Sequence, residues 1–552
     1  MARGARLSNE GDPTPAGAPG PPAEAAAVRA PDTTTPTPAP GTAGPTGEPA
    51  PERVGHHTRR GISWNLVGAA VTNTLRLVTV VVLGRVLDSR DFGVVAAALS
   101  VTVLLQNVRD LGLGPALVQR AALDRAHVAT AFAVSLYLGL GIAALIVLAA
   151  PLIGALYHIE ESVDILRALG VIFFALRGVS AVSIVLCQRA MDFRTIALVD
   201  AGTYTAGTVV AMACALRGAG PWSLVAGYLT EEALAAALYL YLRPPAASLR
   251  IGRAALRDLL GFGAGQTVIQ LAGILATYGD NFVVGRTFGP AALGYYTRAY
   301  DLIKLPSAVF GNVVGNVLFP AFSRLQGDKA RLASGFRRVI MVNALVLLPA
   351  SAALIAVAPE AIRVVMGERW DAAVLPFRIL AISMMMRTSY KVAAMVASAA
   401  GAVGAVAAAN VVYMVCVIAG ATLSVRWGIE GVAATTALSL VVVYVHCSYL
   451  AMQVSGVPAR ALLGAHVPGL LLAAVASAAA WPAVWALRAA GAPAALSFAA
   501  IAVLGIALAL GATALWLRAA APRGGDAAWL REELARVGRR LFSRLGRRGR
   551  RG

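Results

Sequence analysis

The sequence predicts an all-α polytopic membrane protein with about 14 transmembrane helices. Three observations support this fold class. Of the 552 residues, 58% are hydrophobic and only 14% are charged, and apolar runs of about 20 residues, the length needed to cross the hydrocarbon core, recur along the chain. A soluble protein of this size would need more polar surface, so the composition excludes an ordinary cytosolic enzyme.

Fourteen apolar segments are expected to be membrane spans. Their approximate limits are 62–84, 92–117, 127–150, 165–187, 195–216, 221–242, 262–285, 299–322, 339–358, 375–397, 402–425, 430–452, 462–487 and 494–517. An even number of spans puts both termini on one side of the membrane. Basic residues gather in the tails and in the predicted inner loops 243–261 and 323–338. This pattern favours both termini on the cytoplasmic side. The 45 Arg against 3 Lys and the Ala-rich composition indicate a GC-rich bacterial genome, so we expect a bacterial cytoplasmic membrane.

The two ends of the chain differ from the membrane region. Residues 1–60 are rich in Pro and Ala and contain no apolar signal-peptide core, which predicts a disordered cytoplasmic tail. In the tail 519–552, leucines recur at helical spacing opposite a face of arginines. We expect a basic amphipathic helix on the anionic inner leaflet, with a docking site for a cytoplasmic partner as the alternative. Nucleic-acid binding is not expected, because the remaining basic residues lie mostly in short loops.

Several kinds of chemistry are disfavoured by the sequence. Every predicted loop is shorter than about 20 residues, too short for the separate catalytic domain of a membrane glycosyltransferase. No phosphate-binding loop with Gly-Lys-Ser or Gly-Lys-Thr is present. The four cysteines lie in separate apolar runs. We therefore expect no cofactor and no metal site.

A short internal repeat divides the membrane region. The motif Gly84-Arg85 with Gly93 recurs 201 residues later as Gly285-Arg286 with Gly294. A second echo pairs Arg177 with Arg387, 210 residues apart. An even number of spans per repeat makes the two halves parallel.

The repeat predicts two parallel six-helix lobes, residues 61–258 and 259–455, followed by two additional transmembrane helices within 456–518. Transporters built from such repeats bind substrate between the lobes and expose it to each side of the membrane in turn.

Four cations lie deep within predicted spans: Arg76, Arg177, Arg387 and Lys391. An arginine at the bilayer centre costs roughly 2.5–3.5 kcal/mol on insertion scales, so these side chains should face a watery cavity or a partner. Arg387 and Lys391 are four residues apart and share a helix face. Guanidinium groups suit bidentate contact with phosphate oxygens, which predicts an anion site between the lobes.

Two carboxylates also lie deep in predicted spans, Asp200 and Asp280. One interpretation is that they pair with the buried arginines. The other is that they bind a coupling proton or sodium ion.

The start of the eighth span carries a dense polar motif that includes Tyr295, Tyr296, Arg298, Asp301 and Lys304. The three charged residues are spaced by three, which predicts an ion-pair ladder along one helical turn. The tyrosines form either an interfacial belt or a stacking surface for a sugar, and the whole motif is a candidate for sugar or lobe-gate contacts.

Together these motifs resemble the Wzx-type polysaccharide flippases. The resemblance covers about residues 60–455 and rests on Gly84-Arg85-Val86-Leu87 with Asp91-Phe92-Gly93, Asp110-Leu111-Gly112-Leu113-Gly114-Pro115-Ala116-Leu117-Val118-Gln119, Pro221-Trp222-Ser223-Leu224-Val225-Ala226-Gly227, Gly294-Tyr295-Tyr296-Thr297-Arg298-Ala299-Tyr300 and Leu318-Phe319-Pro320-Ala321-Phe322. The long N-terminal tail and the basic C-terminal tail depart from the compact ends of that family.

The resemblance implies flipping of undecaprenyl-pyrophosphate-linked oligosaccharides from the inner to the outer leaflet for surface polysaccharide biosynthesis. It implies a polyprenyl-pyrophosphate-linked oligosaccharide and the lipid bilayer as partners, work beside a polysaccharide polymerase and glycosyltransferases, and we expect a monomer. The same superfamily also holds drug/cation antiporters and peptidoglycan-precursor flippases, which stay open as alternatives. A membrane-embedded glycan-modifying enzyme is the remaining alternative.

Overall fold

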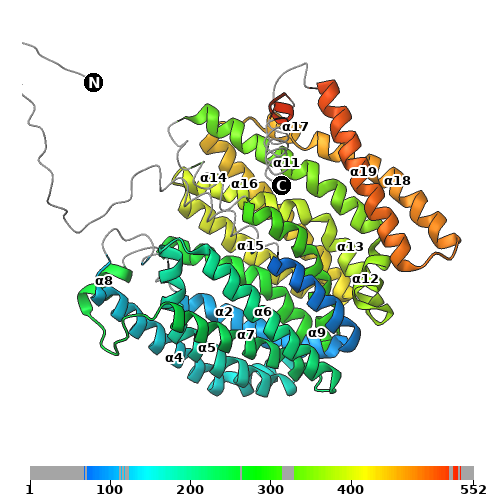
Figure 1. The fold of residues 1–552 in the computed structure, drawn as a ribbon. Helices are drawn as coiled ribbons and strands as arrows, with labels where there is room; N and C mark the ends of the chain where they lie inside the picture. The colour runs from blue at the N-terminus through cyan, green and yellow to red at the C-terminus, as the bar shows by residue number, and fades with distance from the viewer. Residues whose placement is uncertain are drawn as a thin grey trace, which may run out of the picture. The chain divides into compact units, whose positions relative to one another are not determined.

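The computed structural model describes residues 71–110, 123–260, 264–313 and 328–520, with positions 68, 114, 117, 322, 526, 528–532 and 535 beside them. All regular structure in these residues is helical (Figure 1). The predicted N-terminal tail lies outside the described residues, as does most of the predicted C-terminal tail.

The N-terminal half, residues 71–260, consists of long helices joined by short turns. These are a helix over 71–86, α2 (Ser89–Asp110), α4 (Arg125–Tyr157), α5 (Glu161–Arg189), α6 (Phe193–Leu216), α7 (Pro221–Leu242) and the short α8 (Arg253–Leu260). Single residues at the N-termini of α6 and α7 favour the start of each helix. Asp192 caps α6 by accepting a hydrogen bond from the Thr195 amide at 3.2 Å. Pro221 occupies the first turn of α7, where its missing N–H costs nothing.

The C-terminal half, residues 264–520, begins with two helices joined at a kink at Gly289. Its elements are α9 (Ala264–Val313), α11 (Lys329–Ala356), α12 (Ala358–Met366), η2 (Glu368–Ala373), α13 (Val374–Ile382), α14 (Met384–Ala399), α15 (Val403–Ser424), η3 (Val425–Trp427), α16 (Gly428–Ser455), α17 (Ala459–Gly464), α18 (Val467–Ala489) and α19 (Ala494–Ala520). Asp328 caps α11 by accepting from the Arg331 amide at 3.0 Å.

The predicted apolar segments lie mostly on helix where the structure describes them. Span 339–358 is divided at Val357 between α11 and α12, and span 462–487 is divided at Ala465 and His466 between α17 and α18. The predicted spans 262–285 and 299–322 are separated, as expected, by a kink at Gly289 within α9. The φ of 81° there is a conformation that glycine adopts at little cost. The predicted span 375–397 is divided at Ser383, where the chain bends by 40° between α13 and α14.

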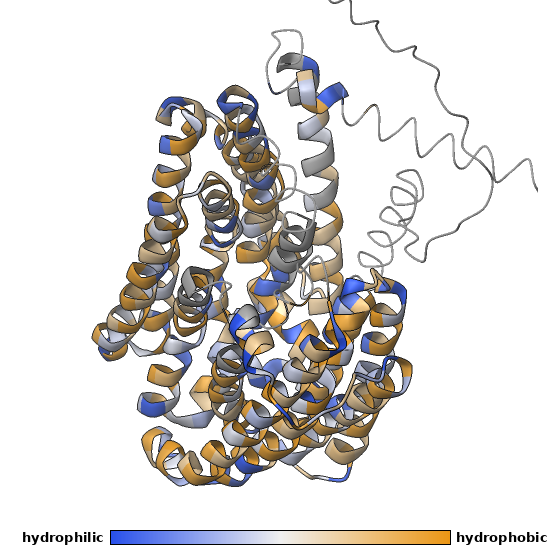
Figure 2. Cartoon of the chain, turned by 90° about the vertical axis from the view of Figure 1, so that its left-hand side faces the viewer, coloured by the Kyte–Doolittle hydropathy of each residue, from blue (hydrophilic) through white to orange (hydrophobic). Residues whose placement is uncertain are grey.

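Seven helical segments of the described residues are long and apolar enough to cross a membrane, or eight if the bent pair counts as one span. One reason for the smaller number is that Glu231 and Glu232 lower the hydropathy of α7. Apolar residues line most of the helical surface (Figure 2), and several large ones, such as Leu148 and Trp485, are well exposed. These features are those of a multi-pass membrane protein. The count of 14 spans and the lobe boundaries stay predictions.

The two halves meet where α2 packs along α9. A Cβ added at Gly93 would lie 1.7 Å from the carbonyl oxygen of Pro290, and one added at Gly294 would lie 1.8 Å from that of Ser89. Ser89 and Pro290 are 201 residues apart, like the two glycines. The two contacts are therefore equivalent across the repeat, and they support the repeat proposed from sequence.

The repeated arginines also make equivalent contacts. Arg85 donates to the carbonyl oxygen of Val364 at 2.8 Å, in the last turn of α12. Arg286 donates to that of Leu156 at 2.7 Å, in the last turn of α4. The last carbonyls of a helix lack intrahelical partners and carry partial negative charge, so a guanidinium satisfies both needs. Each half therefore caps a helix of the other.

Further bonds join the halves at the same end of the bundle. The indole of Trp370 donates to the carbonyl oxygen of Gly84 at 2.9 Å, and Arg369 binds Asp88 at 2.8 Å. Trp370 is almost fully buried and packs edge-on against Phe92 of α2. One continuous hydrophobic core runs through this junction from the N-terminal to the C-terminal half.

We predict that Gly93→Ala and Gly294→Ala each destabilise the folded protein, by about 1–3 kcal/mol, because the added methyl group overlaps a backbone carbonyl and forces α2 away from α9. The midpoint of thermal denaturation of the purified protein in detergent should fall. Gly141→Ala is the matched control, since a Cβ at that helical position meets nothing within 4 Å, and alanine favours the helix. Equal stability of the Gly93, Gly294 and Gly141 variants would contradict the contact.

Candidate functional site

Tyr300 of α9 lies at the centre of a cationic cluster in the C-terminal half. The Arg387 guanidinium is 4.5 Å from the centre of its ring, and Lys304 Nζ is 4.4 Å from it. Arg387 is 9% exposed, and its Nη1 has no hydrogen-bond partner among the described residues. An aromatic face can stabilise a desolvated cation by about 2 kcal/mol. Tyr300 thus holds two positive charges inside an apolar bundle.

Asp301 neutralises part of this charge. It pairs with Lys304 at 3.1 Å and with Arg298 at 3.1 Å. This is the ion-pair ladder that the spacing of three predicts. Arg298 also lies over the ring of Phe92, 4.8 Å from its centre, and so reaches across to α2 of the N-terminal half. Asp301 pairs with two of the three cations Arg298, Lys304 and Arg387, so the cluster keeps a net positive charge.

Asp280 lies within electrostatic range of Lys304 and Arg387, in a fully buried polar network. Its carboxylate accepts from the Tyr296 hydroxyl at 2.6 Å and from Thr436 at 3.3 Å. The Asn281 amide donates to it at 2.8 Å. Tyrosine, threonine and backbone donors, rather than an arginine, therefore satisfy Asp280. Tyr296 is completely buried beside it, whereas Tyr295 is half-buried and reaches the carbonyl oxygen of Arg369.

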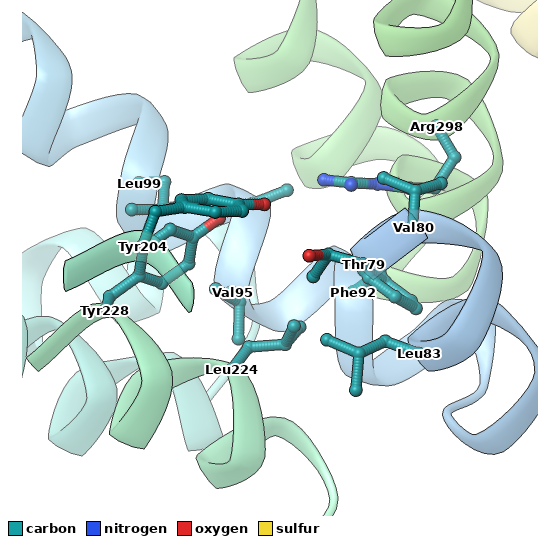
Figure 3. A pocket seen from close by; sticks show the side chains of 11 residues that line it. Thr79, Val80, Leu83, Phe92, Val95, Leu99, Tyr204, Leu224, Tyr228 and Arg298 are labelled. Carbon is teal, nitrogen blue, oxygen red and sulfur yellow. The ribbon is translucent and has the colours of Figure 1, made fainter. Parts of the chain in front are cut away.

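A cavity of about 70 Å³ lies in the N-terminal half, and Arg298 of α9 closes one side of it. Its polar lining consists of Thr79, Tyr204 and Tyr228 from the N-terminal half and Arg298 from α9. Its apolar lining includes Leu83, Phe92, Val95, Leu99 and Leu224. Figure 3 shows Arg298 extending into this space, with the hydroxyls of Thr79 and Tyr204 turned toward it.

A second charged cluster lies beside the cavity in the N-terminal half. Arg76 lies over the ring of Tyr204, 6.0 Å from its centre. Arg177 pairs with Glu232 at 3.0 Å. Asp200 accepts a hydrogen bond from Tyr239 at 2.8 Å and is within electrostatic range of Arg177 and Arg76.

The structure places the four predicted cations in two groups. Arg76 and Arg177 belong to the N-terminal cluster. Arg387 belongs to the C-terminal cluster, and Lys391, one turn further along α14, is exposed and lies within electrostatic range of Arg387 and Lys304. Arg298 contacts the cavity directly. Asp200 and Asp280 each accept a hydrogen bond from a tyrosine hydroxyl, and each also lies within electrostatic range of an arginine, so both interpretations of these carboxylates stay predictions.

Sequence reasoning missed four residues of this region: Glu231, Glu232, Tyr204 and Tyr228. A signal for the two glutamates was available, since they lie in the predicted span 221–242 and the cost of a charge in lipid applies to carboxylates as it does to arginines. The tyrosines gave no such signal, because a single tyrosine in an apolar helix is ordinary.

The arrangement suits recognition of an anion that carries a polar, ring-shaped group. Arginine and lysine supply charge-assisted hydrogen bonds to phosphate oxygens. Tyrosine rings supply flat faces with a hydroxyl at the edge, which fit a sugar ring. The described part of the site supplies cations, phenols and carboxylates as binding groups.

Comparison with known proteins is consistent with this geometry. The model of a family described as polysaccharide biosynthesis protein matches residues 82–375, just over half of the chain. The lipopolysaccharide biosynthesis protein WzxC of Escherichia coli (strain K12) is 24% identical over 340 residues, which cover 60% of this chain and 68% of that protein. The succinoglycan biosynthesis transport protein ExoT of Rhizobium meliloti (strain 1021) is 29% identical over 331 residues, covering 59% and 65%.

A solved structure of the lipid II flippase MurJ in an inward closed conformation matches the fold. The TM-score is 0.66 at 14% sequence identity, and the match covers 82% of this chain and 98% of MurJ. At this identity the likeness concerns the fold alone.

We predict that Tyr296→Phe lowers the free energy of unfolding by about 1–3 kcal/mol, because Asp280 loses a hydroxyl donor inside a region that water does not reach. Thermal denaturation of the purified protein measures the change. Tyr295→Phe is the control, since its hydroxyl makes one long bond of 3.3 Å at an exposed position. If the two variants are equally stable, the Asp280 network does not stabilise the fold.

Proposed function

Because the chain belongs to the polysaccharide biosynthesis protein family, we propose that this multi-pass membrane protein flips an undecaprenyl-pyrophosphate-linked oligosaccharide across the bacterial cytoplasmic membrane. The family and the relatives WzxC and ExoT support transport in polysaccharide biosynthesis. No bond is made or broken during such transport, so the protein is a transporter rather than an enzyme. The work of the chain is to lower the cost of moving a charged, hydrated headgroup through apolar lipid.

One observation carries the proposal: Arg298 of the C-terminal half lines a cavity of the N-terminal half, and Arg76 lies beside the wall of that cavity. The wall residue beside Arg76 is Tyr204. A diphosphate between the halves would meet guanidinium groups from each of them, and these groups match its oxygens bidentately. Tyr204 and Tyr228 offer faces to the first sugar. Arg387, Lys304 and Lys391 supply further positive charge beyond Arg298.

In the proposed mechanism the two halves rock about their shared contact. The headgroup enters from the cytoplasmic side while the prenyl chain stays in lipid between the lobes. Arg76, Arg177, Arg387 and Lys391 neutralise the pyrophosphate together with Arg298. Parallel repeats of this kind move against each other around a central site. Both termini are cytoplasmic in this proposal, and reporter tags at each end test that orientation.

A drug/cation antiporter is the second candidate, and Asp280 is the residue that would favour it. A cationic drug needs an accessible carboxylate. In this structure Asp280 is fully buried and bonded to Tyr296 and Thr436, so it does not face the cavity. This network suits a coupling ion better than an organic cation. Cation efflux that depends on Asp280 would favour the antiporter.

We predict that deleting the gene in its host causes lipid-linked oligosaccharides to accumulate on the cytoplasmic side and one surface glycan to disappear. Leaflet position is measured with an impermeant sugar-modifying enzyme. Wild-type protein should restore flipping. Arg298→Ala should reduce the rate about 10- to 100-fold, because it removes a charge-assisted contact worth about 1.5–3 kcal/mol.

Two further variants control this experiment. Arg331→Ala removes an arginine whose side chain is 77% exposed at the start of α11, and it should leave flipping unchanged. Arg298→Lys keeps the charge and should retain part of the activity if the contact is electrostatic. Membrane insertion of each variant is verified by immunoblot of the membrane fraction. Unchanged lipid intermediates in the deletion strain would overturn the flippase proposal.

A further inference from the structure

Five charged side chains come together where α5, α6, α7 and the helix over 71–86 pack. They are Arg76, Arg177, Asp200, Glu231 and Glu232. Two of the three carboxylates are partnered: Glu232 pairs with Arg177 at 3.0 Å, and Asp200 accepts from Tyr239 at 2.8 Å. Glu232 is 7% exposed, so this ion pair is largely removed from solvent.

Unlike Glu232 and Asp200, Glu231 forms no hydrogen bond or ion pair with any residue that the structure describes. It is held in place by a close helix crossing, because a Cβ added at Gly207 of α6 would lie 3.1 Å from Glu231 Cβ and 2.6 Å from the carbonyl oxygen of Gly227. An acidic group is thus fixed inside an apolar helix pair without a partner of its own, beside two arginines that other groups already engage.

The net charge of this cluster is negative when all its groups are ionised, so it disfavours an anionic substrate. With every group ionised, two arginines and three carboxylates leave a net charge of −1. A diphosphate diester adds two more negative charges. If its oxygens take Arg177, Glu232 loses its counter-ion in a largely buried position, and a buried carboxylate without a partner is strongly disfavoured in its charged form. Protonation of one or both glutamates removes this conflict and makes the cluster neutral or positive.

We propose that Glu232 competes with the substrate diphosphate for Arg177, with Glu231 beside it as a second proton acceptor, so that binding of the anionic substrate is accompanied by uptake of a proton from water. The inference rests on the proposed function and assigns roles to two residues of the N-terminal cluster. The proton forms an O–H bond on a glutamate when the diphosphate takes the arginine. It returns to water when the substrate leaves and Glu232 regains Arg177.

The other groups around Glu231 do not replace it in this role. On α7 itself the neighbours are Glu232 and Tyr228, and on α6 they are Asp200 and Tyr204. α5 contributes Arg177 and the helix over 71–86 contributes Arg76. Residues 92–108 of α2 carry no charged side chain. Across the cavity, Arg298 is paired with Asp301.

The test measures binding of undecaprenyl diphosphate N-acetylglucosamine to the full-length protein in lipid nanodiscs. This probe is a diphosphate diester, whose two charges stay constant over the pH range used. We predict that the affinity of the wild-type protein falls as the pH rises from about 6 to about 8, by up to about tenfold per pH unit for each proton taken up. Glu231→Gln should flatten this dependence, and Glu232→Gln should raise the affinity at the higher pH, since it leaves Arg177 free.

Glu161→Gln is the matched control, because this exposed glutamate at the start of α5 pairs with Arg90 away from the cluster. It should keep the pH dependence of the wild type. Binding that does not change with pH, or an equal pH dependence in the Glu231→Gln and Glu232→Gln variants and the wild type, would overturn the competition while leaving the flippase proposal intact. No binding of the probe at any pH would overturn the proposed function, and the competition with it.

Discussion

A charge inside an apolar helical bundle must have a partner, and this requirement governs how the helices of this protein meet. Lys304 and Arg387 lie against one tyrosine ring. Asp280 is met by the hydroxyls of Tyr296 and Thr436 from α9 and α16. Arg177 of α5 reaches Glu232 of α7. The contacts of Arg387 with Tyr300, of Thr436 with Asp280 and of Arg177 with Glu232 join different helices, so these polar groups act as specific cross-links within a core that hydrophobic packing alone would leave less defined.

The two halves share an internal repeat, but they partner the arginines of that repeat differently. Arg177 and Arg387 occupy matching places in the repeat. Arg177 is neutralised by a carboxylate, whereas Arg387 is held by aromatic rings and keeps its positive charge. The N-terminal cluster is consequently rich in carboxylates and the C-terminal cluster is rich in cations. A ligand between the two clusters meets a fixed positive charge on one side and an adjustable charge on the other.

Much of the fold follows from local patterns, whereas most of the site does not. Apolar length located the helices because the hydrocarbon core sets a minimum span, and the spacing of Arg298, Asp301 and Lys304 predicted their pairing because residues three apart share a helix face. The bond between Tyr239 and Asp200 joins different helices, and no sequence period encodes such a contact. The bend at Ser383 was also invisible, since no proline or glycine marks it. Glu231 and Glu232 were missed because the cost of a buried charge was considered for cations and for aspartates only.

At one end of the bundle each half makes the same kind of contact with the other, so these contacts form and break together. Arg85 and Arg286 each cap a helix of the opposite half. Gly93 and Gly294 each lie in close contact with a backbone carbonyl of the opposite half. Because the contacts are reciprocal, separating one member of a pair also separates the other. Partial opening would lose nearly as many bonds as full opening while gaining little room. The reciprocal contacts therefore hold the two halves together as one unit at this end of the bundle.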